Sequence, residues 1–167
     1  MRLDELNALD DDAATRELLR CCGSTQWAAR MAAARPFADA AALMDRADAI
    51  WWSLQPDDWL EAFGAHPRIG GTGGARTGET REWSAQEQSG VAGAARAVAE
   101  RLAIANRDYE ARFGYIFIIC ATGRSAAEML DALERRLANP PDRELREAAE
   151  EQRRITRLRL EKLLHAA

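Results

Sequence analysis

Helix-forming residues fill most of this chain, and they constrain its fold more than any other feature. Alanine is abundant and β-branched residues are scarce, so helix propensity is high over most of the sequence. Apolar residues recur at helical spacing in successive stretches, which end at Gly, at Pro or at capping side chains. We therefore predict an all-α fold: a multi-helix bundle of about eight helices with one short extended segment.

The predicted helices have clear start signals. Ser24 and Asp39 precede two of them as N-caps, and Pro56 suits the first turn of a third. Ser125, with Glu128 three residues later, matches a capping box. The predicted helices cover residues 4–9, 13–21, 25–34, 40–54, 56–63, 84–112, 125–137 and 142–164.

Two stretches break the helical pattern. Residues 115–120 read "YIFIIC", a short apolar run that is either extended or buried helix; its length and the preceding Gly114 favour an extended segment. Residues 64–83 form a long glycine-rich stretch, and loops of that length are often functional. This stretch lacks the GxxxxGK[ST] pattern and does not follow a strand, which argues against a phosphate-binding P-loop.

Size, charge and cysteine usage exclude several classes of protein. The 167 residues suffice for one domain, so we predict a single domain over residues 1–167. A net charge of −4 argues against a nucleic-acid partner, and no apolar run approaches a membrane span. Cys21, Cys22 and Cys120 form no CxxC pair, which indicates free thiols, and Cys120 lies in an apolar run typical of an inert buried thiol. With an acidic, amphipathic start and no signal peptide, we expect a cytoplasmic protein.

His66 is the first candidate for chemistry. It is one of two histidines in the chain, and it lies directly before Pro67 where a short helical run ends. Proline restricts the backbone there, so the ring has a defined direction, and an imidazole can act as a general acid or base near neutral pH. The alternative is a loop histidine that caps a helix end or binds a carbonyl. No second His or Cys stands at ligand spacing, so we predict no metal site.

Three polar residues continue the apolar face of the predicted helix over residues 84–112 toward its start: Ser84, Glu87 and Gln88. Buried polar groups need partners, which are either one another or a ligand in a pocket. Ser84 and Glu87 also match a capping box, which would give Glu87 a structural role only. The apolar face itself consists of Val91, Ala95, Val98, Leu102, Ala105 and Tyr109.

Arg159 falls within the apolar stripe of the last predicted helix, whereas Arg153, Arg154 and Arg157 are explained by a solvated charge run. A buried guanidinium needs an anionic or carbonyl partner, and a carboxylate from Glu87 or from a ligand would serve. A snorkelling arginine or a structural ion pair is the alternative. The stripe is made of Leu145, Ala148, Gln152, Ile155 and Leu163.

Four ordered motifs, "AHPRIG", "WSAQEQSG", "FGYIFIICATGRS" and "ITRLRL", resemble in order and spacing those of the OHCU decarboxylase family of urate degradation. OHCU is 2-oxo-4-hydroxy-4-carboxy-5-ureidoimidazoline. The N-terminal "LDELNALD" and the "RPF" at residues 35–37 are also similar, so the resemblance covers essentially the whole chain. It implies an all-α fold of the family's own type. It also implies loss of CO2 from OHCU to give (S)-allantoin, with no metal or organic cofactor, in a homodimer.

The resemblance also implies the site residues. The family's catalytic histidine corresponds to His66, and the arginine of its "LRL" motif corresponds to Arg159, which the helical pattern had already singled out. We therefore predict His66, Glu87 and Arg159 as catalytic. The predicted substrate contacts are Pro67, Ser84, Glu87, Gln88 and Arg159, with main-chain groups of Ile118, Ile119, Cys120, Ala121 and Thr122.

Two features depart from the family's pattern or qualify the resemblance. The loop "GTGGARTGET" after the first motif is richer in glycine than is typical of the family, and the chain's end "LLHAA" is no peroxisomal address, as in bacterial members.

The alternative function is a non-catalytic helical interaction module on this fold, with Trp51 and Trp52 as its contact patch. A ureide hydrolase is a third reading, but it would need a metal or an activated nucleophile, and neither motif is present.

Overall fold

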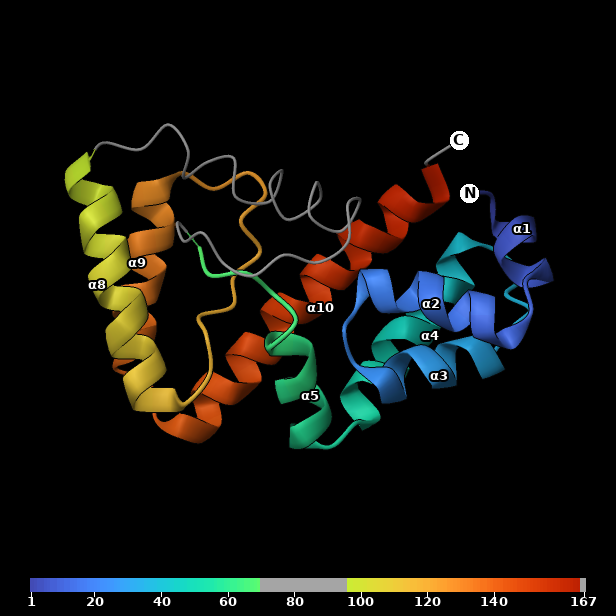
Figure 1. The fold of residues 1–167 in the computed structure, drawn as a ribbon, viewed down its shortest axis with the longest axis horizontal. Helices are drawn as coiled ribbons and strands as arrows, with labels where there is room; N and C mark the ends of the chain where they lie inside the picture. Colours follow the sequence, from blue (N-terminus) through green and yellow to red (C-terminus); the bar gives the residue numbers. More distant parts are fainter. Residues whose placement is uncertain (70–95, 166–167) are drawn as a thin grey trace. The chain divides into compact units, whose positions relative to one another are not determined.

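The computed structural model describes residues 1–69 and 96–165, and α-helices make up most of this described part of the chain (Figure 1). It contains eight α-helices and no strand, which confirms the predicted all-α fold. The helices are α1 (Leu3–Ala8), α2 (Asp11–Cys21), α3 (Thr25–Ala33), α4 (Ala40–Ser53), α5 (Pro56–Phe63), α8 (Arg96–Phe113), α9 (Ala126–Leu137) and α10 (Pro141–His165).

Helices α2, α3, α4 and α9 begin where a capping side chain accepts one of the first backbone N–H groups. The Ser24 and Asp39 side-chain oxygens each accept a backbone N–H three residues on, at 3.2 and 2.7 Å. Ser125 and Glu128 make both bonds of the predicted capping box, at 3.1 and 2.8 Å. Helix α2 begins two residues earlier than predicted, because Asp10 caps it with a bond of 2.7 Å to the N–H of Ala13.

The chain divides into two compact units. Unit 1 comprises Met1–Ala62 with Gln152–Ala167, and unit 2 comprises Phe63–Glu151. Helix α10 supplies residues to both. The single domain over residues 1–167 stays a prediction.

Unit 1 buries its aromatic side chains with their polar atoms paired. The Trp27 indole N–H donates to the carbonyl of Ala47 at 3.1 Å, and the Trp59 indole N–H donates to the carbonyl of Trp51 at 3.0 Å. The rings of Trp51 and Trp59 lie 5.9 Å apart, and Trp52 meets Trp59 edge-on at 5.8 Å. Trp51 is only 2% exposed, so it does not form the contact patch that an interaction module would need.

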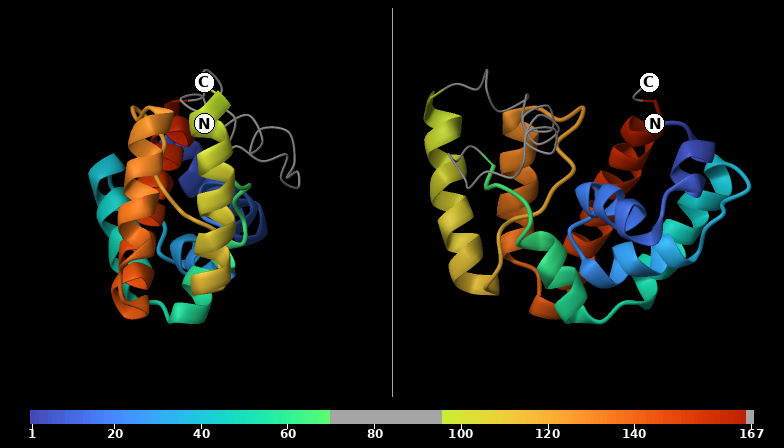
Figure 2. Two further views of the ribbon diagram at one scale, coloured as in Figure 1. Left: turned by 90° about the vertical axis from the view of Figure 1, so that its left-hand side faces the viewer. Right: turned by 45° about the vertical axis from the view of Figure 1, so that its right-hand side comes forward.

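Unit 2 is built on the pair α8 and α9, which lie side by side in both views of Figure 2. Residues 114–125, between these two helices, form no helix, as predicted for "YIFIIC". We call residues 115–121 the extended segment. Its odd-numbered side chains enter the apolar cluster between the helices, which comprises Ile69, Leu102, Ala105, Tyr109, Phe117, Ile119, Ala121, Ala126, Met129, Leu130 and Leu133.

Two predictions fall partly outside the described residues. The predicted helix over residues 84–112 corresponds to α8 from Arg96 onward, and residues 84–95 lie outside the description. The glycine-rich stretch is described only over residues 64–69, which form a turn and no helix. Within the described residues, no helix is both long and apolar enough to span a membrane.

Candidate functional site

The His66 corner is a tight turn at the end of α5. The His66 N–H donates to the carbonyl of Phe63 at 3.1 Å, which closes the turn, and Pro67 follows directly. His66 and Pro67 are both half-buried, whereas Ala65 before them and Ile69 after them are buried. The imidazole therefore stands on a backbone whose two flanks are held in the core of the unit.

Residues before and after the His66 turn pack against other parts of unit 2 and hold the turn in place. The Phe63 ring lies 5.4 Å from the ring of Tyr115, at the start of the extended segment. Ile69 joins the apolar cluster that also holds Ile119 and Ala121. Its carbonyl accepts a hydrogen bond of 3.2 Å from the Asn106 side chain on α8. The structure thus brings the candidate histidine and the candidate main-chain contacts into the same unit, along neighbouring stretches of chain.

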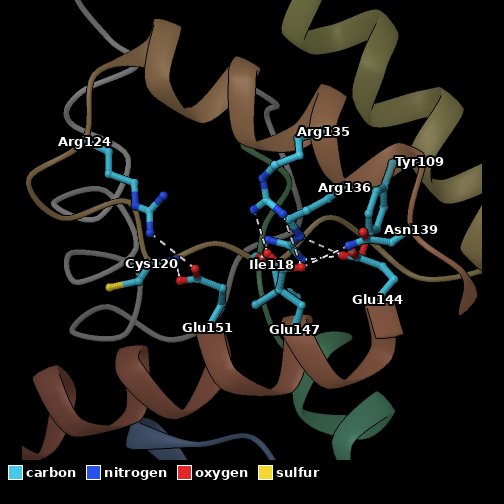
Figure 3. Close-up of polar contacts among 10 residues, drawn as sticks. All are labelled: Tyr109, Ile118, Cys120, Arg124, Arg135, Arg136, Asn139, Glu144, Glu147 and Glu151. Atoms are coloured by element: carbon cyan, nitrogen blue, oxygen red, sulfur yellow. Dashed lines mark hydrogen bonds and ion pairs between the residues drawn. The ribbon is translucent and has the colours of Figure 1, made fainter. Parts of the chain in front are cut away.

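The extended segment is held at its backbone by two buried charged side chains (Figure 3). The carbonyl of Ile118 accepts a hydrogen bond of 2.7 Å from Arg136 on α9, and the N–H of Cys120 donates to Glu151 on α10 at 3.0 Å. A segment outside a sheet has no ladder to satisfy these groups, so side chains take that role. The N–H of Cys120 is therefore engaged by the protein itself.

Sequence analysis missed the buried ion pair behind this segment. Arg136 and Glu144 are 1% and 0% exposed, and Nε and Nη2 of Arg136 lie 2.8 and 2.5 Å from Oε1 of Glu144. Tyr109 and Asn139 also donate to Glu144, at 2.5 and 2.9 Å. Burial, and next its bond to Glu144, raises the pKa of Tyr109 above its ordinary range.

A signal for this pair exists in the helical spacing. Glu144 precedes Ala148 by one turn, on the same face as Ile155, whereas the predicted stripe began one residue later at Leu145, which is only half-buried. Arg136 likewise continues the buried face of α9 after Leu133. A charge at such a position on each of two consecutive helices indicates a buried pair.

Arg159 is buried in unit 1, as predicted, with 3% of its surface exposed. It shares this part of α10 with other buried polar side chains, of which Gln152 donates to the hydroxyl of Thr156 at 3.2 Å. The charge of Arg159 acts on the pKa of two thiols of unit 1. Burial raises the pKa of Cys21 to about 12 and that of Cys22 to about 11, although the positive charge of Arg159 acts to lower both.

The two buried thiols predict a loss of stability in alkali. Burial raises the folded-state pKa of the Cys21 and Cys22 thiols above the ordinary 9.0. Their contribution to the free energy of unfolding is therefore fully present below pH 9. As the pH rises from 9 toward 11, the unfolded state ionises first, and each thiol lowers the free energy of unfolding by up to about 1.4 kcal/mol per pH unit. Urea unfolding between pH 8 and 10 should show a shallower decline for Cys22→Ala than for the wild type. Equal declines in the two proteins would show that the Cys22 thiol does not cause this loss of stability.

Three arginines of α10 were predicted to form a solvated run, and two of them form ion pairs instead. Arg154 is exposed, as predicted. Arg153 and Arg157 are half-buried, and each contacts Oδ2 of Asp48 on α4 at 2.8 Å. These two arginines therefore bind α10 to α4 within unit 1, and Arg159 is the buried one of the series.

The predicted site residues are distributed as follows. His66, Pro67 and the main-chain groups of residues 118–122 belong to unit 2, and Arg159 belongs to unit 1. Ser84, Glu87 and Gln88 lie outside the described residues, so a Glu87–Arg159 contact stays a prediction. In the part of the chain that is described, no three His, Cys, Asp or Glu side chains are grouped so as to hold a metal ion.

Comparison with known proteins identifies the family. The model of the family "OHCU decarboxylase" matches residues 7–161. This chain belongs to the OHCU decarboxylase family. The resemblance inferred from the four motifs is thereby confirmed, and it extends over nearly the whole chain.

Two relatives of known name are proteins of uric acid degradation. The "Uric acid degradation bifunctional protein TTL" of Arabidopsis thaliana is 41% identical over 86% of this chain, and the match covers 45% of that protein. "Uric acid degradation bifunctional protein PucL" of Bacillus subtilis (strain 168) is 29% identical over 95% of this chain and 32% of its own length. This chain thus spans less than half of either relative. A likeness to bacterial members in particular stays a prediction.

A solved structure shares the fold. The crystal structure of OHCU decarboxylase in the presence of (S)-allantoin superposes with a TM-score of 0.78 at 38% sequence identity. The match covers 93% of this chain and 99% of that chain.

Proposed function

We propose that this chain converts OHCU to (S)-allantoin by decarboxylation, in the degradation of urate, without a metal or organic cofactor. The observation that carries the proposal is the match along 99% of an OHCU decarboxylase chain whose structure was solved in the presence of (S)-allantoin. The family match over residues 7–161 supports it. The half-buried histidine on an anchored corner supplies a group suited to proton transfer.

The reaction needs charge stabilisation as well as a proton. Loss of CO2 leaves an electron pair on carbon, which spreads into the adjacent carbonyl and ring, so donors must lie where this negative charge develops. Peptide N–H groups of residues 118–122 are the proposed donors. Because the N–H of Cys120 already donates to Glu151, the proposal places this role on the backbone edge opposite to Cys120, where the N–H groups of Ile119 and Ala121 lie.

The side chains have distinct proposed roles. Arg159 holds a carboxylate or carbonyl oxygen of the substrate, while Ser84 and Gln88 recognise ureido and ring edges. Glu87 accepts ureido N–H bonds and orients the ligand. His66 moves one proton: it takes the 4-hydroxyl proton as CO2 leaves, or it donates a proton to the resulting carbanion. Proton delivery from one side yields the (S) product.

Enzymatically generated OHCU tests the proposed function directly. The optical signal of freshly made OHCU should decay faster with the protein than without it. Chiral analysis of the allantoin should show an excess of the (S) form over the spontaneous background. A decay rate equal to the background, with racemic allantoin, would contradict the proposal.

Arg159→Ala is expected to weaken (S)-allantoin binding more than Arg157→Ala does. Loss of a charge-assisted hydrogen bond from a buried guanidinium corresponds to about 10- to 100-fold in Kd. Arg157 is matched in charge and helix, but it is half-buried and bound to Asp48, so its removal should change Kd by less than about twofold. Calorimetric titration of both variants, after circular dichroism has shown that they fold, decides this. Equal effects would remove Arg159 from the site.

A homodimer, which the family resemblance implies, is part of the proposal. Sedimentation equilibrium of the purified chain tests it, and a single species with the mass of one chain would contradict it.

A further inference from the structure

Glu151 is a buried carboxylate that the proposed chemistry does not use. It is 7% exposed, and its two oxygens have different partners (Figure 3). Oε2 accepts the N–H of Cys120 at 3.0 Å, and Oε1 lies 3.3 Å from Nη2 of Arg124, which follows the extended segment. A carboxylate loses hydration when it is buried, so its retention at this position depends on these partners.

The two anchors of the extended segment act on the same edge of its backbone. In extended chain, the N–H and C=O groups of residues i and i+2 point to one edge of the backbone, and those of residue i+1 point to the other edge. The carbonyl of Ile118 and the N–H of Cys120 are bound by Arg136 and Glu151, so they define one edge. The N–H groups of Ile119 and Ala121 consequently lie on the opposite edge.

The side chains complete the constraint. Ile119 and Ala121 are 5% and 4% exposed and pack in the apolar cluster of unit 2, which limits sliding of the segment. Rotation about the axis of the segment is restrained by the bonds at its edge. Of the two anchors, Arg136 is needed for a fully buried ion pair, whereas Glu151 pairs with an arginine that is 32% exposed. Glu151 is therefore the anchor that can be altered with less damage to the core.

We propose that Glu151 is a positioning residue of the decarboxylase: by binding the Cys120 N–H it orients the Ile119 and Ala121 N–H groups toward the reacting substrate. This inference rests on the proposed function. Glu151 itself touches no substrate in this scheme. A displacement of about 1 Å in a catalytic group can cost about 100-fold in rate, so a loosened segment lowers turnover even in a folded protein.

The kinetic test compares Glu151→Ala and Glu151→Gln with Glu147→Ala. Glu147 is a matched control, because it lies one turn earlier on α10 and forms an ion pair of 2.6 Å with Arg135 without contacting the segment. Turnover is expressed per (S)-allantoin-binding site, so that unfolded protein does not count. We expect kcat to fall at least about 30-fold in Glu151→Ala, with KM within about threefold. Glu151→Gln, which keeps an acceptor oxygen, should recover to within about fivefold of wild type, and Glu147→Ala should stay within about twofold.

The outcomes separate the two proposals. A wild type that does not accelerate OHCU decay defeats the proposed function. A wild type that does, with kcat per binding site equal in Glu151→Ala and Glu147→Ala, defeats the positioning role alone. Equal loss in Glu151→Ala and Glu151→Gln also defeats it, because the acceptor oxygen would then not matter.

A second measurement remains available if Glu151→Ala does not fold. The chain has three cysteines, so 15N-cysteine labelling yields three backbone amide signals, and Cys120→Ala assigns the relevant one. Replacing the carboxylate by an amide in Glu151→Gln should shift the Cys120 signal far more than those of Cys21 and Cys22. An unchanged Cys120 signal would show that the hydrogen bond does not exist and would overturn the inference.

Discussion

Replacing His66 with asparagine is expected to remove most turnover while leaving (S)-allantoin binding nearly unchanged. A general acid or base contributes about 10²- to 10⁴-fold to rate, and asparagine can hydrogen-bond but cannot transfer the proton. The corner should survive the change, because its anchors are the Phe63 and Ile69 contacts and the backbone bond from His66 to Phe63. We therefore expect kcat to fall and Kd for (S)-allantoin to remain within about threefold.

The chain supplies its own control for this experiment. His165 is the other histidine, exposed at the end of α10, where its Nδ1 lies 2.7 Å from the carbonyl of Glu161. His165→Asn should leave both kcat and Kd at wild-type values. If His66→Asn retained near-normal kcat, the proton-transfer role would be wrong, even with the family assignment intact.

Arg136→Met is expected to cause the largest loss of stability among the described residues discussed above. It would leave the Glu144 charge buried without its cation and the Ile118 carbonyl without its donor. Removing one partner of a buried ion pair costs about 3–5 kcal/mol. Arg135→Met is the matched control, since Arg135 is the preceding residue and is exposed where it pairs with the half-buried Glu147, so its removal should cost less than about 1 kcal/mol. Urea unfolding of both variants measures the difference.

A double variant tests the reason for that loss. Replacing both charges, as in Arg136→Met with Glu144→Leu, removes the unpaired buried carboxylate and should recover part of the stability that Arg136→Met loses. Recovery should be incomplete, because Tyr109 and Asn139 also donate to Glu144 and would lose their acceptor. A double variant no more stable than Arg136→Met would show that the buried charge is not what makes the single substitution costly.

Helix positions were predictable because their signals are local. The Ser24 and Asp39 caps and the Ser125 capping box act on backbone groups three residues away, so the sequence alone contains both partners. The burial of Arg159 was likewise predictable, because helical spacing places it on the apolar face of α10. The start of the α10 stripe was predicted wrongly: Leu145 is half-buried, whereas Glu144 before it is buried, because Arg136 from α9 supplies its partner.

By itself, the sequence determined the helical fold, the non-helical segment between α8 and α9, and the family, since each depends on neighbouring residues or on ordered motifs. Only the tertiary structure decided which buried polar groups pair. Arg136 with the carbonyl of Ile118, and Glu151 with the N–H of Cys120, join separate elements of unit 2. The physical reason is that burying such a charge costs little free energy only when the folded chain brings its partner to it. Helical spacing does not encode a partner that lies 18 or 31 residues away.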